Sequence, residues 1–352
     1  MNISKKPFGI TKDGEKATSY TITNDHGMKV VVTDYGANII SIIVPDRDGK
    51  MADVALGYDK VSDYEKNLPG FGSIIGRHAN RIGNAKFTIK GKEYELEKND
   101  GENNLHSGSK SYNKYFYETE IFEEDDEISI EFSRLSKDME QGFPGNLDYS
   151  VTYTLTNENE LVLEYYGVSD KETVVNFTNH SYFNLAGHNS GSVEQQEVWV
   201  DSNKVTAVDK GLIPNGEYID VTNTPLDFRM RKQIGADINA DYEPLKIAGG
   251  YDHNYVLNCT GDDIEKVAEL FDPKSGRLME VFTDLPGMQL YTGNFIGSEK
   301  GKDNASYKRR DGVCFETQYY PNACNIPHFP SPIVKAHQEF ETVTIYKFSV
   351  EK

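Results

Sequence analysis

The sequence predicts an all-β protein built as a large antiparallel sandwich or barrel. Apolar and polar residues alternate with a period of two along much of the chain, which is typical of strands with one buried face. The chain contains 22 tyrosines and 17 phenylalanines, and aromatic side chains suit strands and sandwich interiors. Helical periodicity is scarce. Together these observations favour sheets packed on sheets.

The predicted elements follow one another with turn residues between them. Strands at 28–33 and 39–44 are joined through Gly36, and a short hairpin of 86–89 and 94–96 turns at Gly91. Further strands are expected at 174–177, 197–200, 255–257, 267–271, 278–282, 288–291, 313–317 and 343–350. Only 61–66 and 234–239 carry a helical signal, of a turn or two each.

The clearest single element is a hairpin near the middle of the chain. Apolar residues alternate with polar ones from Leu147 to Leu155, the segment 157–159 turns the chain, and 161–166 returns. The acidic run 123–127 lies between two strand-like segments and reads as a solvated loop. No internal repeat or linker-like stretch interrupts the pattern, so we expect residues 1–352 to form a single domain.

Composition narrows the class of protein. A net charge of -19 without a basic tract argues against a nucleic-acid surface and against acidic lipid. Cys259, Cys314 and Cys324 form no C-x-x-C pair, which argues against a disulfide framework or a structural zinc site. The first residues lack a signal-peptide core, and no long apolar run occurs. We therefore expect a cytoplasmic monomer or homodimer.

Polar residues gather in five short segments that resemble turns at strand ends. They are 76–82, 103–108, 176–187, 249–255 and 315–318. The third holds His180 among amides and hydroxyls, where an imidazole can exchange protons near neutral pH. Each residue also has a plain structural explanation, such as a capped turn or a surface ion pair. The spacing of glycines in segment 70–76 differs by one residue from the nucleotide-binding motif G-x-G-x-x-G. We interpret the segment as the part of the chain that leads into a strand.

Taken together, the segments resemble the galactose mutarotase, or aldose 1-epimerase, family. The matching motifs are GRHANRI at 76–82, NNLHSG at 103–108, TNHSYFNLAG at 178–187, GYDHNY at 250–255, PGMQLYTGN at 286–294, FETQ at 315–318 and the stretch 327–330. They occur in the family's order and cover nearly the whole chain. The resemblance implies the galactose mutarotase-like β-sandwich with few short helices, and a sugar in an open cleft on one sheet.

The resemblance also implies roles for individual residues. Glu316 corresponds to the general base, His180 to the general acid, and His106 to a second histidine near the ring oxygen. The residues expected to hold sugar hydroxyls are Arg81, Asn80, Asp252 and Gln289. The expected activity is that of an isomerase that interconverts the α and β anomers of free hexoses such as galactose and glucose, without a cofactor or metal.

The chemistry of mutarotation explains why such residues are needed. Opening a cyclic hemiacetal removes a proton from the anomeric hydroxyl and delivers one to the ring oxygen. A carboxylate such as Glu316 suits the first step, and an imidazolium such as His180 suits the second. This requires Glu⁻ with His⁺ at rest. Nearby carboxylates favour that state, whereas burial and the cations His106 and Arg81 oppose it.

Three other functions remain open on the sequence alone: a hexose-6-phosphate 1-epimerase, a non-catalytic carbohydrate-binding protein, and a structural or interaction protein, for which nothing besides size argues. A hexose-6-phosphate 1-epimerase of the same fold would need cations for the phosphate, with Arg77 or Lys110 as candidates. A non-catalytic carbohydrate-binding protein would have no need of both Glu316 and His180. A metal site would gather His106, His180, Asp252 and Glu316, but no metal-binding spacing supports one. For Arg77 and His78 we favour structural positions, and Cys314 reads as a buried strand residue.

Overall fold

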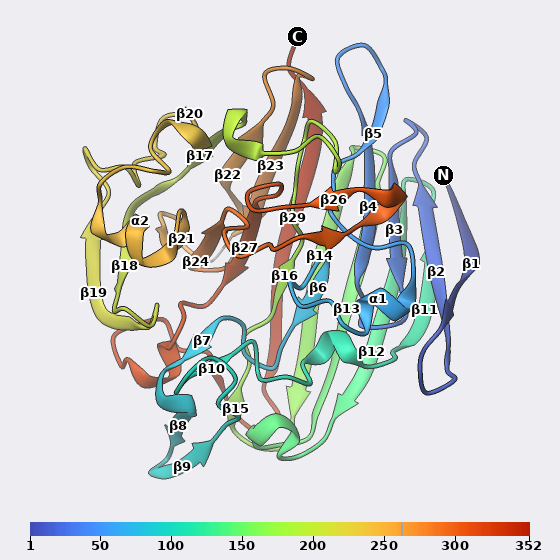
Figure 1. The fold of residues 1–352 in the computed structure, drawn as a ribbon. Coiled ribbons are helices and arrows are strands. Elements are labelled where there is room, and N and C mark those ends of the chain that lie inside the picture. The colour runs from blue at the N-terminus through green and yellow to red at the C-terminus, as the bar shows by residue number, and fades with distance from the viewer. Residues whose placement is uncertain (262) are drawn as a thin grey trace.

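The computed structural model describes residues 1–261 and 263–352 and consists mainly of antiparallel sheets (Figure 1). Within those residues, the α-helices are α1 (Val61–Tyr64) and α2 (Glu243–Ala248), and a few single 3-10 turns join strands. The all-β prediction is therefore confirmed. Neither helix has the length and apolarity that crossing a membrane would require.

The largest sheet forms the back wall of the molecule in Figure 1. Nine strands are ordered in it across the described part of the chain. In sheet order they are β11 (Glu118–Glu123), β12 (Glu127–Ser136), β13 (Leu147–Thr156), β14 (Glu160–Ser169), β29 (Glu339–Val350), β23 (Arg277–Thr283), β22 (Glu265–Phe271), β17 (Glu197–Val200) and β20 (Lys232–Gln233).

The predicted central hairpin is the pair β13 and β14 of this sheet. Its register places Tyr153 opposite Leu163 and Val151 opposite Tyr165, so their side chains share one face. All four are buried in the core. Alternation in the sequence thus becomes one apolar face of the sheet, which needs a second layer to cover it.

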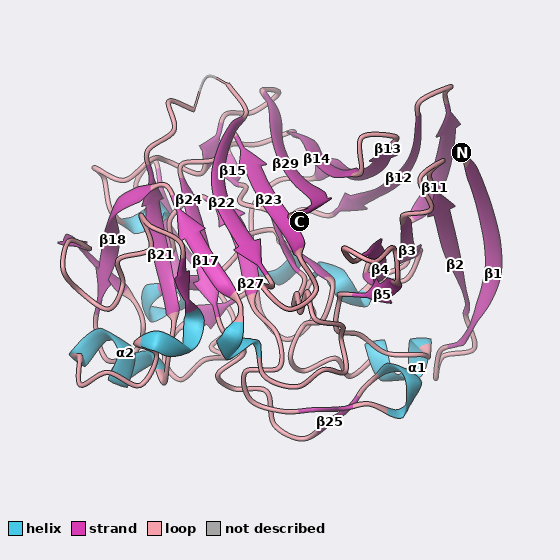
Figure 2. Cartoon of the chain, turned by 90° about the horizontal axis from the view of Figure 1, so that it is seen from above, coloured by secondary structure: helices cyan, strands magenta, loops and turns pink. Residues whose placement is uncertain are grey.

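Two five-stranded sheets provide that layer on either side of the molecule, as the view in Figure 2 shows. The first consists of β1 (Asn2–Ile10), β2 (Lys16–Thr23), β3 (Lys29–Thr33), β4 (Ile39–Pro45) and β5 (Met51–Asp53). The second has the order β19 (Pro214–Asp220), β18 (Ser202–Val208), β21 (Asp252–Leu257), β24 (Gly287–Tyr291) and β27 (Cys314–Gln318). One apolar cluster contains buried residues from all three sheets, including Ile39, Tyr153 and Phe315.

The remaining strands are short pairs that carry loops. They are β6 (Ser73–Ile75) with β16 (Thr178–His180), β7 (Arg81–Ile82) with β10 (Asn104–Leu105), β8 (Lys86–Ile89) with β9 (Lys92–Glu95), β15 (Thr173–Val174) with β28 (Ile333–Val334), and β25 (Glu299–Lys300) with β26 (Ser306–Tyr307). The first two pairs matter most for function, because they end in the polar segments that the sequence singled out.

Several predicted elements differ from the structure. The helical signal at 234–239 gives only a 3-10 turn at Ile234–Ala236, and the second α-helix follows at Glu243–Ala248. That helix has the expected signals, with Pro244 in its first turn and Gly249 at its end at φ 68°. Of the predicted strand at 174–177, only Val174 lies in a strand, β15, and residues 175–177 connect it to β16. Among the strands of six or more residues, β1, β2, β18 and β19 were not predicted. β11 and β12 are the strand-like segments on either side of the acidic run 123–127, for which no bounds were predicted.

Candidate active site

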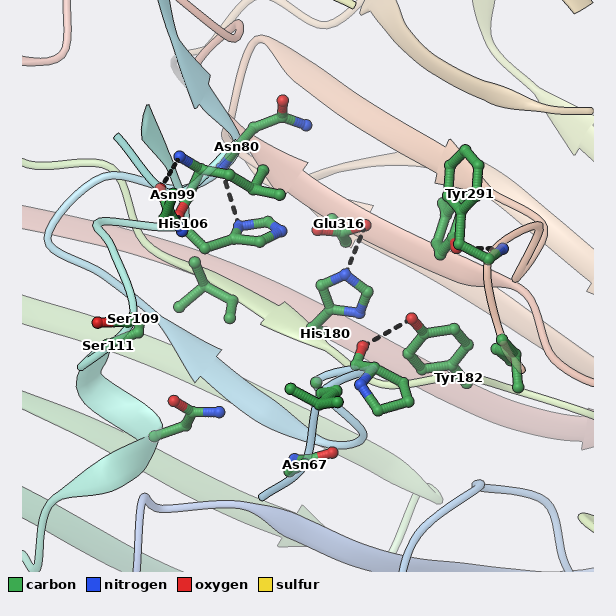
Figure 3. A pocket seen from close by; sticks show the side chains of 18 of the residues that line it. Asn67, Asn80, Asn99, His106, Ser109, Ser111, His180, Tyr182, Tyr291 and Glu316 are labelled. Carbon is green, nitrogen blue, oxygen red and sulfur yellow. Dashed lines mark hydrogen bonds and ion pairs between the residues drawn. The ribbon is translucent and has the colours of Figure 1, made fainter. Parts of the chain in front are cut away.

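An open cleft of about 610 Å³ lies over one face of the sheet that contains β21, β24 and β27 (Figure 3). Six of the seven residues proposed from the sequence line it: Asn80, Arg81, His106, His180, Asp252 and Glu316. They come from chain segments more than 200 residues apart. The seventh, Gln289, lies behind the cleft wall and is buried.

Strand register explains how this sheet presents its polar residues. Tyr291 on β24 pairs with Asp252 on β21 and with Cys314 on β27, and Gln289 pairs with Glu316. Because side chains alternate along a strand, these five residues share one face. The intervening residues, such as Met288, Leu290 and Phe315, point into the apolar core on the other face. One sheet thereby supplies both core and cleft.

Glu316 lies at the floor of the cleft and is only 2% exposed. Burial, reinforced by the negative charge of Asp252, raises the pKa of its carboxyl well above the ordinary value, and Arg81 acts in the opposite direction. Its Oε2 atom has no hydrogen-bond partner among the described residues. A buried carboxylate oxygen without a partner is costly, and a hydroxyl of a bound ligand would satisfy it.

His180 ends the short strand β16, which lies against β27. Its Nε2 atom is 3.6 Å from Oε1 of Glu316, and its Nδ1 atom is 3.6 Å from the sulfur of Cys314. Its ring stacks on Tyr182 at a centroid distance of 5.0 Å, and the Tyr182 hydroxyl donates to the carbonyl of Pro69 at 2.7 Å. These contacts hold the ring so that one nitrogen faces Glu316 (Figure 3).

The pKa values of His180 and Glu316 do not favour the Glu⁻ and His⁺ state that the reaction requires. Burial lowers the pKa of His180 to about 4, so its ring is neutral at pH 7. Since the pKa of Glu316 is raised and that of His180 is lowered, a proton shared by the pair lies on the carboxyl rather than on the ring. The effect of burial therefore outweighs the attraction of the cleft carboxylates for an imidazolium. The 3.6 Å between Nε2 and Oε1 is an ion-pair distance that exceeds a hydrogen bond, so a proton moves between the two groups only when they approach more closely or a sugar oxygen lies between them.

His106 follows β10, and Asn80 precedes β7, its partner strand. The main-chain N–H of His106 donates to the carbonyl of Asn80 at 3.0 Å, and the main-chain N–H of Asn80 donates to Nδ1 of His106 at 3.1 Å. The His106 ring meets His180 edge to face at 5.4 Å. The Arg81 side chain, also in the cleft, donates through Nε to Asp100 at 2.8 Å. A loop pair thus brings two histidines together.

Asp252 and Gln289 form a coupled pair rather than two independent cleft residues. The Gln289 amide donates through Nε2 to Oδ1 of Asp252 at 2.6 Å. Burial raises the pKa of Asp252, while Arg81 and this hydrogen bond act in the opposite direction. Asp252 lines the cleft and Gln289 does not. Gln289 is therefore placed to orient Asp252 from behind.

Other cleft residues were not identified from the sequence as site residues. Tyr291 lies two residues after Gln289 on the same strand, so strand parity alone would have placed it on the cleft face. Tyr182 and Phe295 also line the cleft, and the buried Tyr182 belongs to an apolar cluster as well. Phe295 is 65% exposed at the rim and stacks on Tyr291 at 6.2 Å. Phe183 and Tyr251 lie in the core.

Arg77 and His78 both lie outside the cleft lining and are fully buried. The Arg77 guanidinium donates to the Pro144 carbonyl at 2.6 Å and to Ser136 Oγ at 2.7 Å, so it braces neighbouring loops. The His78 main chain is bonded through its N–H and its carbonyl to Ser107 Oγ, at 2.8 and 3.0 Å. Burial lowers the pKa of His78 to about 3. These contacts are structural.

Three side chains of the cleft are of the types that bind metal ions. His106, His180 and Glu316 offer ligand atoms within 4.8 Å of one another. Metal-ligating histidines normally donate their second ring nitrogen to an acceptor. In His106 that second nitrogen, Nδ1, instead accepts a hydrogen bond from the main-chain N–H of Asn80. This donor set does not fit a metal centre.

Comparison with known proteins agrees with the geometry. The family model described as "Aldose 1-epimerase" matches residues 18–347. A "Galactose mutarotase" from Bos taurus is 40% identical over 351 residues, which is 99% of each chain. An "Aldose 1-epimerase" from Escherichia coli (strain K12) is 33% identical over 344 residues, which is 97% of this chain and 98% of the relative.

Solved structures give the same result for the fold. A galactose 1-epimerase from Lactobacillus acidophilus NCFM superposes with a TM-score of 0.88 at 26% identity, covering 100% of this chain and 99% of its own. An aldose epimerase homologue from C. elegans gives a TM-score of 0.84 at 27% identity, covering 94% and 98%. The similarity therefore extends through all three sheets and the cleft.

Proposed function

The chain belongs to the aldose 1-epimerase family and interconverts the anomers of aldose sugars, and we propose that its substrates are free hexoses such as galactose and glucose, with Glu316 and His180 as the acid–base pair. The observation that carries this proposal is the 3.6 Å separation of Nε2 of His180 and Oε1 of Glu316 in the cleft. The anomeric and ring oxygens share one carbon, so the groups that serve them have to lie close together.

In the proposed mechanism, Glu316 takes the proton of the anomeric hydroxyl while His180 delivers one to the ring oxygen. Proton transfer within the pair produces the required Glu⁻ and His⁺ from the resting state. The C1–O5 bond then breaks, and the free aldehyde rotates about the C1–C2 bond. Reclosure on the other face reverses both transfers, with neutral His180 as base and protonated Glu316 as acid. Each well-placed group is worth about a hundred- to ten-thousand-fold in rate.

The remaining cleft residues are proposed to hold the sugar. Asp252 is an acceptor for hydroxyls, and its orientation is fixed by Gln289. Arg81 keeps its charge and presents a planar set of donors, of which Nε is used by Asp100. The Asn80 side chain is also part of the cleft wall. Such groups place C1 and the ring oxygen against the pair, and correct placement itself contributes to the rate.

We also propose that residues 1–352 act as one domain. The last strand, β29, lies between β14 and β23 in the middle of the large sheet. The core cluster combines residues from the first strands of the chain with residues from β27 and β29. A cut between an N-terminal and a C-terminal part would therefore expose apolar surface on both.

A neutral hexose should be a better substrate than its 6-phosphate. Arg77 is buried and bonded away from the cleft. The Lys114 ammonium donates to the three carbonyls of residues 64–66, and Lys110 lines a neighbouring hollow. We expect kcat/KM for α-glucose to exceed that for glucose 6-phosphate by at least about tenfold, the factor that roughly 1.4 kcal/mol produces. Polarimetry on both sugars measures the ratio, and a preference for the phosphate would refute the neutral-hexose assignment.

The pH profile should reflect a pair that carries one proton. A second proton inactivates the pair, and because the pKa of His180 is lowered to about 4, we expect the acid limb of kcat/KM near pH 4 and not near 6.5. Loss of the single proton sets the alkaline limb above the ordinary carboxyl range, since the pKa of Glu316 is raised. Initial rates of anomer interconversion, corrected for the buffer-catalysed rate, give the profile. An acid limb between pH 6 and 7 would contradict this assignment.

A further inference from the structure

A short loop after α1 forms part of the rim of the cleft. Residues 66–70 line the cavity, and Figure 3 shows Asn67 of this loop on the side of His180 that faces away from Glu316. Leu68, at the tip of the loop, is 91% exposed. A segment with so few buried apolar contacts gains little stability from packing, so its position depends on polar anchors.

The loop is in direct contact with the segment that carries His180. The Tyr182 hydroxyl donates to the carbonyl of Pro69 at 2.7 Å, and the Tyr182 ring stacks on His180 at 5.0 Å. The main-chain N–H of Gly72 donates to the carbonyl of His180 at 3.1 Å. A Cβ atom added at Gly70 would lie 3.7 Å from Cγ of His180. A displacement of the loop would therefore displace the imidazole ring.

Lys114 anchors the start of this loop. It ends the 3-10 turn Tyr112–Lys114, and its ammonium donates to the main-chain carbonyls of residues 64, 65 and 66 at 2.9, 3.1 and 3.0 Å. These carbonyls lie at the C-terminal end of α1, where a helix leaves its last carbonyl groups without main-chain partners. A lysine ammonium has three N–H donors, so each carbonyl receives one.

We propose that Lys114 is a positioning residue of the epimerase reaction: its ammonium holds the loop 66–70 in place, and the loop in turn holds His180 beside Glu316. Lys114 lines both the cleft and the neighbouring hollow, so it forms part of the wall between them. It acts through the loop and takes no part in proton transfer. The role assigned to Lys114 rests on the proposed function of the cleft.

The charge of Lys114 determines how firmly it holds the loop. Burial lowers the pKa of its ammonium to about 8, Lys12 acts in the same direction, and Glu65 acts in the opposite direction. A neutral amine has one N–H donor fewer and no longer serves all the carbonyls. Raising the pH through this pKa should therefore loosen the loop. The other titratable side chains beside it are Asp13, Glu15, Tyr35, Lys66, Lys110 and Tyr115.

Three substitutions separate the charge of Lys114 from its bulk. Lys114→Met keeps an unbranched side chain but has no donor, and Lys114→Arg keeps a donor group that stays charged at every working pH. The matched control is Lys110→Met. Lys110 is exposed on the same segment, and its ammonium lies over the Tyr115 ring at 4.9 Å instead of on the loop.

Hydrogen exchange tests the anchor without any activity assay. The main-chain N–H groups of residues 67, 70 and 71 are hydrogen-bonded within the loop. At pH 7 we expect them to exchange at least about tenfold faster in Lys114→Met, which is what one hydrogen bond to a charged group contributes. Lys114→Arg and Lys110→Met should exchange at the wild-type rate. Equal exchange in Lys114→Met and wild type would overturn the proposal.

Kinetics on α-glucose tests whether the anchor matters for the reaction. We expect Lys114→Met to lower kcat/KM by about ten- to a hundred-fold, because misplacing a catalytic group by about 1 Å has an effect of that order. Lys114→Arg and Lys110→Met should remain close to wild type. Circular dichroism and thermal melting establish that each variant is folded. A folded Lys114→Met with a fast-exchanging loop and a wild-type kcat/KM would show that the loop does not position His180.

The pH dependence provides a test in the unmodified chain. NMR of ¹⁵N-labelled lysines, with Lys114 assigned by the resonance missing from Lys114→Arg, measures its pKa, which we expect at about 8. The ratio of kcat/KM for wild type to that for Lys114→Arg should fall with a midpoint at the measured pKa, because only lysine loses its charge. A ratio that stays constant through that pKa would refute the proposal. A wild-type enzyme inactive on every aldose would instead contradict the proposed function, and hydrogen exchange would still decide the anchor.

Discussion

Replacing Glu316 with glutamine should lower kcat for anomer interconversion by about a hundred- to ten-thousand-fold while KM stays close to its wild-type value. Glutamine has nearly the same shape but can neither take nor return a proton at neutral pH. Because Glu316 is buried at the cleft floor and its Oε2 has no hydrogen-bond partner in residues 1–261 and 263–352, the neutral amide fits without leaving a charge unpaired. Polarimetry on freshly dissolved α-glucose measures the effect.

A matched control for this substitution is Glu120→Gln, on the exposed face of β11 at the far edge of the large sheet. The control should retain the wild-type rate and melting temperature. If Glu316→Gln equilibrates the sugar as fast as wild type, Glu316 is not the base. A rise in KM with unchanged kcat would mean that Glu316 binds both ground state and transition state without taking part in proton transfer.

The second large effect is expected for His180→Asn, which should also lower kcat by about a hundred- to ten-thousand-fold. Asparagine keeps a polar group near Cys314, which lies 3.6 Å from Nδ1 of the native ring, but it provides no group that titrates. The acid limb near pH 4 should also disappear from the rate profile, because that limb is assigned to this ring.

Sugar binding distinguishes the possible roles of His180. Titration calorimetry or an NMR titration with galactose should show that His180→Asn largely retains sugar binding. If binding is lost while kcat at saturating sugar is normal, His180 is a positioning residue and the acid has to be sought elsewhere. The matched control is His26→Asn, because His26 is exposed. The buried His188 is unsuitable as a control because it bonds to Tyr307.

Much of the fold could be predicted from local pattern alone. Period-two alternation located β8 and β17 to the residue and most of β13, because in these strands one face is buried and the other is solvated. The pattern failed for β1 and β19, whose residues are mostly exposed along the edges of their sheets and therefore carry too few apolar side chains to alternate. The helix α2 was missed because a segment of six residues is too short to show a helical repeat of apolar residues.

The site was predicted less evenly. Glu316 and Asp252 lie on strands whose parity fixes which face they share, and the loop histidines were marked by their polar neighbours and by the family motifs. Gln289 shares the face but is covered by Asp252, a relation that depends on three-dimensional packing. The protonation of His180 depends on burial, and the His106 ring is held by a main-chain contact from a different segment, neither of which local sequence records.

The central claim is that Glu316 and His180 act on the two oxygens of one anomeric carbon. A crystal structure of the Glu316→Gln variant with galactose bound tests it most directly. We predict the anomeric hydroxyl within hydrogen-bond distance of the residue 316 amide and the ring oxygen within hydrogen-bond distance of Nε2 of His180. A sugar bound with its anomeric carbon directed away from these two side chains would contradict the claim.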